Sequence, residues 1–114
     1  MALTTRVIAW SVEGFSNVAQ NGTITIQANT PELVDTTDGI VYVQNTLTYN
    51  IATGQSDAII CTDNTNTNPS AGNWGYNITI ALSPGIPSIS VQSASLPSGG
   101  GSLSLASILA SAGL

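Results

Sequence analysis

Charged side chains are scarce in this sequence. Of 114 residues, six are acidic and one, Arg6, is basic, and there is no lysine or histidine, so charged residues make up 6% of the chain. Soluble domains commonly carry about 25%. Since most enzymes rely on histidine, lysine, arginine or paired carboxylates, we expect a protein that is not an enzyme and has no cofactor or metal. The net charge of −5 also disfavours nucleic acid and anionic membranes as partners.

Cysteine and long apolar runs are equally limited. Cys61 is the single cysteine, which excludes an internal disulfide, and its place after the apolar run 58–60 predicts a buried thiol. No apolar run approaches the roughly 20 residues that span a bilayer. Residues 1–6 lead directly into a strand-like segment without the apolar core of a signal peptide. We therefore expect that the chain is synthesised in a cytoplasm and is not exported.

Serine, threonine and asparagine fill 38 positions, and 42% of the chain is hydrophobic, enough for one domain with a real core. Apolar residues alternate with polar ones in short segments separated by Gly, Asn and Pro turns, which is typical of strands. The prediction is an all-β fold, a compact antiparallel β-sandwich, Ig-like or similar, of about six to seven strands. The expected strands are 6–12, 23–28, 40–43, 47–51, 57–62, 74–80 and 88–96.

The C-terminal residues follow a different pattern. Three glycines at 99–101 predict a hinge between a sandwich at 1–98 and an apolar arm at 99–114. In the arm, Leu105, Ile108, Leu109 and Ala112 have helical spacing, and Ser102 or Ser104 could cap a short helix. A helix this short needs a docking surface. Either its own sandwich or a neighbouring copy could supply that surface.

A series of motifs follows one another along the chain: Gly22–Ile26, Asp38–Val41, Thr62-Asp63, Pro69, Trp74-x-Tyr76, Leu96-Pro97 and Ser102–Leu109. This order resembles small β-sandwich modules in virion proteins of tailed phages, especially phages of actinobacteria. The resemblance covers roughly residues 4–110. It implies a capsid decoration protein or a minor tail or fibre protein; family members usually carry more charge.

Several local motifs suggest chemistry but favour simpler readings. The run 63–68 is rich in oxygen ligands but lacks the Gly and Glu that a calcium-binding EF-hand loop requires, so a solvated turn is expected. The acidic cluster of Glu32, Asp35 and Asp38 is expected to be a solvated connector. Alternation places the two tryptophans in the core rather than on a carbohydrate platform. Arg6 is expected to pair with Glu13 or a neighbouring subunit, or to lie free on the surface.

Together these observations predict a virion structural protein, most simply a capsid decoration protein that stabilises the head through protein contacts. Its expected partners are the major capsid protein or tail proteins of the same virion and other copies of itself, with a trimer as one form of the homo-oligomer. A minor tail or fibre-attachment subunit is one alternative, and a receptor- or glycan-binding module another. The predicted interface residues are Leu3, Arg6, Tyr42, Tyr49, Leu103, Leu105, Ile108, Leu109 and Leu114.

Overall fold

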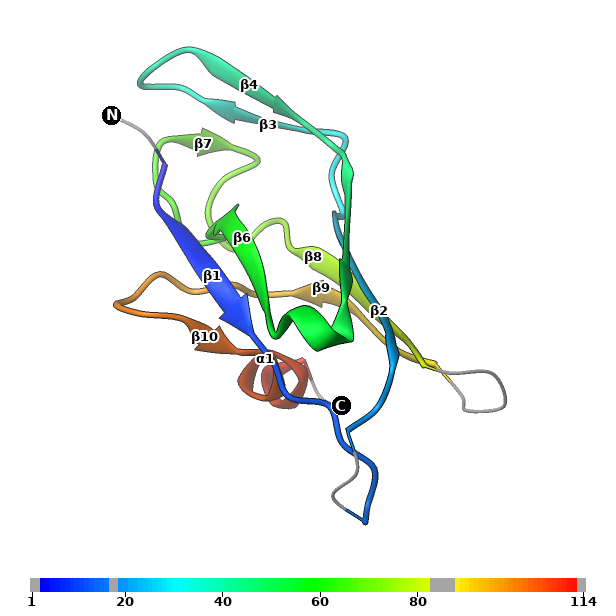
Figure 1. The fold of residues 1–114 in the computed structure, drawn as a ribbon. Helices are drawn as coiled ribbons and strands as arrows, with labels where there is room; N and C mark the ends of the chain where they lie inside the picture. The colour runs from blue at the N-terminus through cyan, green and yellow to red at the C-terminus, as the bar shows by residue number, and fades with distance from the viewer. Residues whose placement is uncertain (1–2, 17–18, 83–87, 113–114) are drawn as a thin grey trace.

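The computed structural model describes residues 3–16, 19–82 and 88–112, and its fold is all-β with one short helix at the C-terminal end (Figure 1). A 3₁₀ turn at Ile51–Thr53 separates two strands. The predicted fold class is confirmed. The strands are β1 (Thr5–Ala9), β2 (Gly22–Ala28), β3 (Glu32–Asp35), β4 (Ile40–Val43), β5 (Thr46–Asn50), β6 (Gln55–Ile60), β7 (Thr67–Asn68), β8 (Tyr76–Leu82), β9 (Ile89–Ala94) and β10 (Leu103–Ser104).

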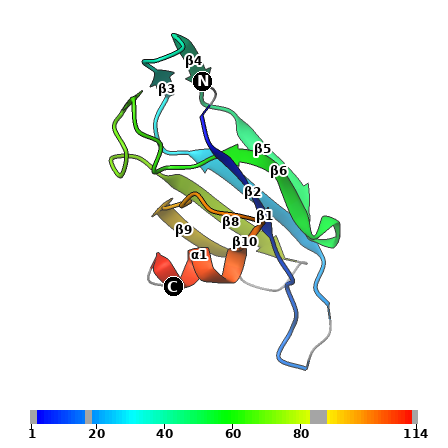
Figure 2. The ribbon, with the colours of Figure 1, turned by 90° about the vertical axis from the view of Figure 1, so that its left-hand side faces the viewer.

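Two sheets enclose the main core. One has the order β10-β1-β6 and the other β5-β2-β8-β9, and Figure 2 shows them as two layers. The first sheet contributes Ile8 and Ile59 to the core, and the second contributes isoleucines and a valine from β2, β8 and β9. Each fully buried side chain of this size stabilises the fold by about 1.5–3 kcal/mol. The core is therefore built mainly from β-branched residues.

The pairing of β2 with β8 shows how the sequence fixes this core. Ile24 lies opposite Ile80 and Ile26 opposite Ile78, with all four side chains buried. The intervening threonines point to the other face, as period-2 alternation requires. Gly22 begins β2 with a φ of 148°, and a Cβ there would collide with the carbonyl oxygen of Ala81. Only glycine fits this position.

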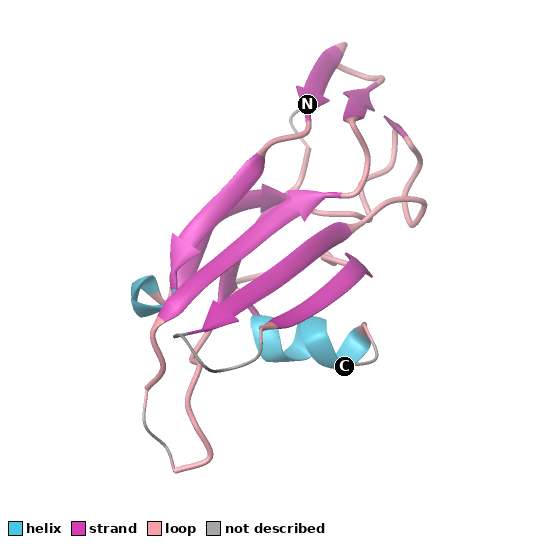
Figure 3. Ribbon diagram, turned by 90° about the vertical axis from the view of Figure 1, so that its right-hand side faces the viewer, coloured by secondary structure: helices cyan, strands magenta, loops and turns pink. Residues whose placement is uncertain are grey.

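A third, smaller sheet of order β4-β3-β7 lies at one end of the molecule (Figure 1). The segments 29–39 and 63–73 lie between the expected strands, but each contains a further short strand, β3 and β7. β3 pairs regularly with β4, from Glu32 opposite Val43 to Asp35 opposite Ile40. These two strands form a hairpin that projects beyond the sandwich (Figures 1 and 3).

The C-terminal segment belongs to the sandwich. β10 pairs with β1 in parallel, and helix α1 (Leu105–Ser111) packs against β9 and β10. Ser104 caps the helix by accepting a hydrogen bond from the Ser107 N–H, and Leu105 and Ile108 are buried in the core. The C-terminal helix therefore docks on the chain's own sandwich, which is one of the two docking surfaces considered above. The expected break at 84–87 lies outside the described residues.

Candidate functional site

The lone basic residue makes an internal contact. The Arg6 guanidinium donates hydrogen bonds to the carbonyl oxygens of Pro97, Gly100 and Gly101, at 3.1 to 3.4 Å. It thereby ties β1 to the glycine segment, which is held in place rather than acting as a free hinge. Pairing with Glu13 was one of the alternatives for Arg6; in the structure Arg6 bonds to these carbonyl oxygens, and the carboxylate of Glu13 accepts a hydrogen bond from the Ser11 hydroxyl.

The acidic cluster is not a solvated connector as a whole. Asp35 is only 1% exposed, and its Oδ1 accepts hydrogen bonds from the backbone N–H groups of Thr37 and Asp38. Its other carboxylate oxygen has no hydrogen-bond partner among the described residues. The expectation was wrong for Asp35 because its side chain closes the turn between β3 and β4 from the inside. Glu32 and Asp38 are exposed, as expected.

The asparagine-rich run 63–68 is mostly exposed, as expected of a solvated turn, but two of its side chains also hold the fold together. The Asn64 side chain accepts from the Thr4 N–H and donates to the Thr4 carbonyl, so it pairs with β1's N-terminal flank as a strand would. Asp63 Oδ2 accepts from both the N–H and the hydroxyl of Ser98. Among residues 3–16, 19–82 and 88–112, no group of three or more His, Cys, Asp or Glu is placed to bind a metal ion.

The predicted interface residues are divided by the structure into two groups. Leu105 and Ile108 are each 3% exposed in the core, so neither side chain is available at the surface of the folded chain. The others among the described residues are half-buried, and Leu114 lies outside the described residues. The half-buried residues are Leu3, Arg6, Tyr42, Tyr49, Leu103 and Leu109.

The aromatic residues mostly serve the core. Trp74 and Tyr76 are buried and meet edge to face, with ring centroids 5.2 Å apart. The Tyr76 hydroxyl donates to the Ile60 carbonyl over 2.6 Å, and burial raises the pKa of this phenol well above 10.0. Trp10 is half-buried, and its ring lies against that of Tyr49 with ring centroids 5.8 Å apart. An inward position is confirmed for Trp74, and these rings form no exposed platform.

Tyr49 and Cys61 carry no sign of reactivity. The Tyr49 hydroxyl donates to Asp57 Oδ2 over 3.3 Å, and burial raises the pKa of Tyr49. The thiol of Cys61 is fully buried, as predicted, and burial together with the nearby carboxylate of Asp63 raises its pKa. A nucleophilic cysteine needs the opposite shift. The structure thus gives no support to nucleophilic chemistry at these residues.

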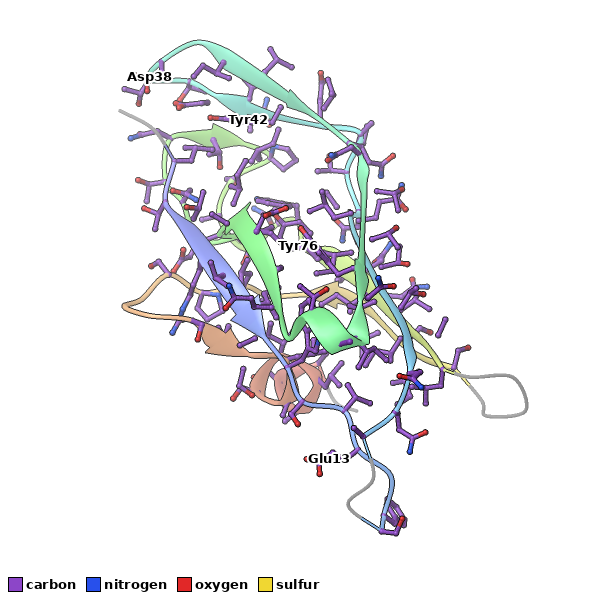
Figure 4. The ribbon with its side chains drawn as sticks, in the orientation of Figure 1. Glu13, Asp38, Tyr42 and Tyr76 are labelled. Atoms are coloured by element: carbon purple, nitrogen blue, oxygen red, sulfur yellow. The ribbon has the colours of Figure 1, made fainter. Side chains whose placement is uncertain are left out.

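Among the described residues, the largest group of exposed apolar side chains lies on β4, the strand that also carries Tyr42. Ile40, Val41 and Val43 of β4 are 42%, 55% and 72% exposed, and we call these three residues the hairpin patch. Phe15 is fully exposed in a loop near Glu13, and Figure 4 places Glu13 at the end of the molecule opposite Asp38 and the hairpin. The sequence signal for this patch is the continuous apolar run Ile-Val-Tyr-Val. Strands with such runs are normally covered on both faces, so an uncovered one is a candidate contact surface.

A cavity of about 370 Å³ lies beneath the hairpin. Its lining is mainly apolar, drawn from β2 to β6 and the start of β8, and includes the rings of Tyr42, Trp74 and Tyr76. Glu32 is the only charged lining residue. The Trp74 indole N–H is buried without a hydrogen-bond partner among the described residues. Volume and lining match those of small-ligand pockets.

Comparison with known proteins supplies no assignment: no family model matches the chain, and no curated protein or solved structure matches it. Within the described part of the chain, no helix has the length and apolar character needed to cross a membrane.

Proposed function

We propose that this protein is a structural component of a phage virion, most simply a decoration protein bound to the head surface. The observation that carries the proposal is the use of charge. Of the seven charged residues, Arg6, Asp35 and Asp63 hold the backbone together and Asp57 contacts Tyr49. The remaining surface consists mostly of hydroxyl, amide and aliphatic groups. Burying these groups against another protein costs less free energy of desolvation than burying charged groups would.

The motif resemblance described above supplies the setting. A head lattice offers many identical sites, so modest contacts repeated over a surface suffice for stable decoration. A minor tail or fibre-attachment subunit would use the same kind of surface in fewer copies.

The proposal is tested by sedimenting the purified chain with heads that lack it. Because few charges are available, binding should change little between about 0.1 M and about 1 M salt, where long-range charge interactions are screened. Binding that disappears at the higher salt concentration, or no binding to heads at all, would count against decoration. Serum albumin at equal concentration is the control for nonspecific sedimentation.

A second candidate function, a receptor- or glycan-binding module, is favoured by the cavity beneath the hairpin. Of the residues considered for such a role, Tyr42 lines this cavity, whereas Tyr49 packs on Trp10. Binding on a glycan array that is lost in Tyr42→Ala and kept in Tyr49→Phe would support this function. An array without signal would remove it.

A further inference from the structure

β4 is an edge strand without the usual protection. Within the part of the chain that the structure describes, its sheet has the order β4-β3-β7, so one side of β4 pairs with no strand. Edge strands are normally blunted by charge, proline or a bulge. β4 has none of these: it reads Ile-Val-Tyr-Val, and its register with β3 is unbroken. In Figure 1 its outer side faces away from the molecule.

The ladder shows which backbone groups are free for pairing. The N–H of Gln44 donates to Pro31 on the β3 side over 3.0 Å. Successive residues of an antiparallel strand point their backbone N–H and C=O groups to opposite sides of the strand. The backbone groups of Tyr42 therefore also face β3, and those of Val41 and Val43 point outward. The same two residues carry the most exposed side chains of the hairpin patch.

We infer that β4 pairs antiparallel with β4 of a second copy of this chain, around a two-fold axis at Tyr42. In this register Val41 lies opposite Val43 of the second copy, which exchanges the outward backbone groups and sets β-branched side chains against each other. The result is one continuous sheet across both copies, β7-β3-β4 followed by β4-β3-β7.

The distribution of charge fits pairing with a second copy. The register sets Asp38 opposite Thr46 and Ile40 opposite Gln44 of the other copy, so no carboxylate faces another along the paired strands. Such opposition is the usual penalty when an acidic chain associates with itself. With about four residues per strand, the contact belongs to the smallest interface class, so association should be weak and concentration-dependent. This inference does not depend on the virion proposal, and it uses neither chain terminus.

Cysteine pairing tests the register directly. Ile40 and Gln44 of the second copy form a pair without mutual hydrogen bonds, with Cα atoms about 4.5 Å apart, within disulfide range. Ile40→Cys and Gln44→Cys are prepared separately, and the native Cys61 is buried in both. On mild oxidation, mixing the two variants should give a heterodimer by mass spectrometry, and neither variant alone should crosslink. Crosslinking of either variant alone, or none in the mixture, overturns the inference.

A second measurement does not depend on disulfide chemistry. Sedimentation velocity up to millimolar concentration should show a monomer–dimer equilibrium that Val43→Lys abolishes. Thr48→Lys is the matched control, because Thr48 is exposed on β5, another edge strand. Circular dichroism checks that both variants fold. A chain that stays monomeric overturns the inference. If the chain stays monomeric and Val43→Lys weakens its binding to heads, a strand of the capsid protein pairs with this edge in place of a second copy.

Discussion

Ile8 of β1 lies in register with Leu103 of β10, and this parallel pair joins the two ends of the chain in one sheet. Ile8 is itself a core residue, 1% exposed, and the helix that follows β10 buries Ile108 in the same core. The C-terminal segment is thus a structural part of the sandwich.

Deletion of residues 102–114 should therefore abolish cooperative folding rather than release an arm. A milder change is Ile108→Ala, which should cost about 2–5 kcal/mol of unfolding free energy by leaving a cavity. Ala106→Ser, on the exposed face of the same helix, should change it by less than about 0.5 kcal/mol. Urea unfolding followed by tryptophan fluorescence measures all three. A truncated chain that still unfolds cooperatively would contradict this account.

Arg6 should matter for stability although it is not fully buried. Arg6→Ala removes the donors to Pro97, Gly100 and Gly101, which should lower the unfolding free energy by about 1–2 kcal/mol. Arg6→Lys should recover only part of the loss, because an ammonium group cannot reproduce the planar fork. Equal stability of all three proteins in urea titrations would show that the contact is unimportant.

Asp35 should be needed for the hairpin turn. Asp35→Ala leaves the N–H groups of Thr37 and Asp38 without their acceptor, and a loss of about 1–3 kcal/mol is expected. Asp35→Asn keeps an acceptor oxygen and should be closer to the wild type. Hydrogen exchange at residues 36–39 provides the local readout. Unchanged protection there in Asp35→Ala would contradict the role assigned to this side chain.

Alkaline solution should destabilise the protein through Cys61 and Tyr76. Both groups are neutral when protonated, and burial raises the pKa of each in the folded state above the ordinary values of 9.0 and 10.0. The unfolded chain therefore loses these protons first. Stability should be full below about pH 9 and fall as the pH rises through these values.

The variants Cys61→Ala and Tyr76→Phe separate the two contributions. Each is expected to be less stable at neutral pH, Tyr76→Phe because the Ile60 carbonyl loses its donor, but each should show a shallower decline at high pH. Thermal unfolding between pH 7 and pH 11 measures the slopes. Slopes identical to the wild type would show that these groups do not set the alkaline limit.

Alternation of apolar and polar residues was sufficient to predict the large strands. It predicted strands at 23–28 and 74–80, and the alternating isoleucines of these strands, Ile24, Ile26, Ile78 and Ile80, are all buried. The sequence of β3, Glu-Leu-Val-Asp, has too few apolar residues to show a period, and its pairing with β4 depends on the turn that Asp35 closes. The parallel pairing of β10 with β1 joins residues nearly 100 positions apart in the chain, and no local pattern encodes such a contact.

The candidate surface was less predictable than the fold. Helical spacing identified Leu105 and Ile108 as apolar and in need of a partner, but it could not show that the partner was the chain's own core. The exposed β4 strand was predicted as a strand, yet its position at a sheet edge follows from the order β4-β3-β7. Exposure of an apolar strand is a property of topology, which the residues of that strand do not specify.

The number of copies in a purified virion tests the proposed function most directly. Quantitative mass spectrometry against a labelled standard of this chain, with the major capsid protein as internal reference, gives the ratio. The account predicts hundreds of copies per particle, in a fixed ratio to the capsid protein. A handful of copies would assign the chain to the tail, and a particle that contains none would contradict a virion role.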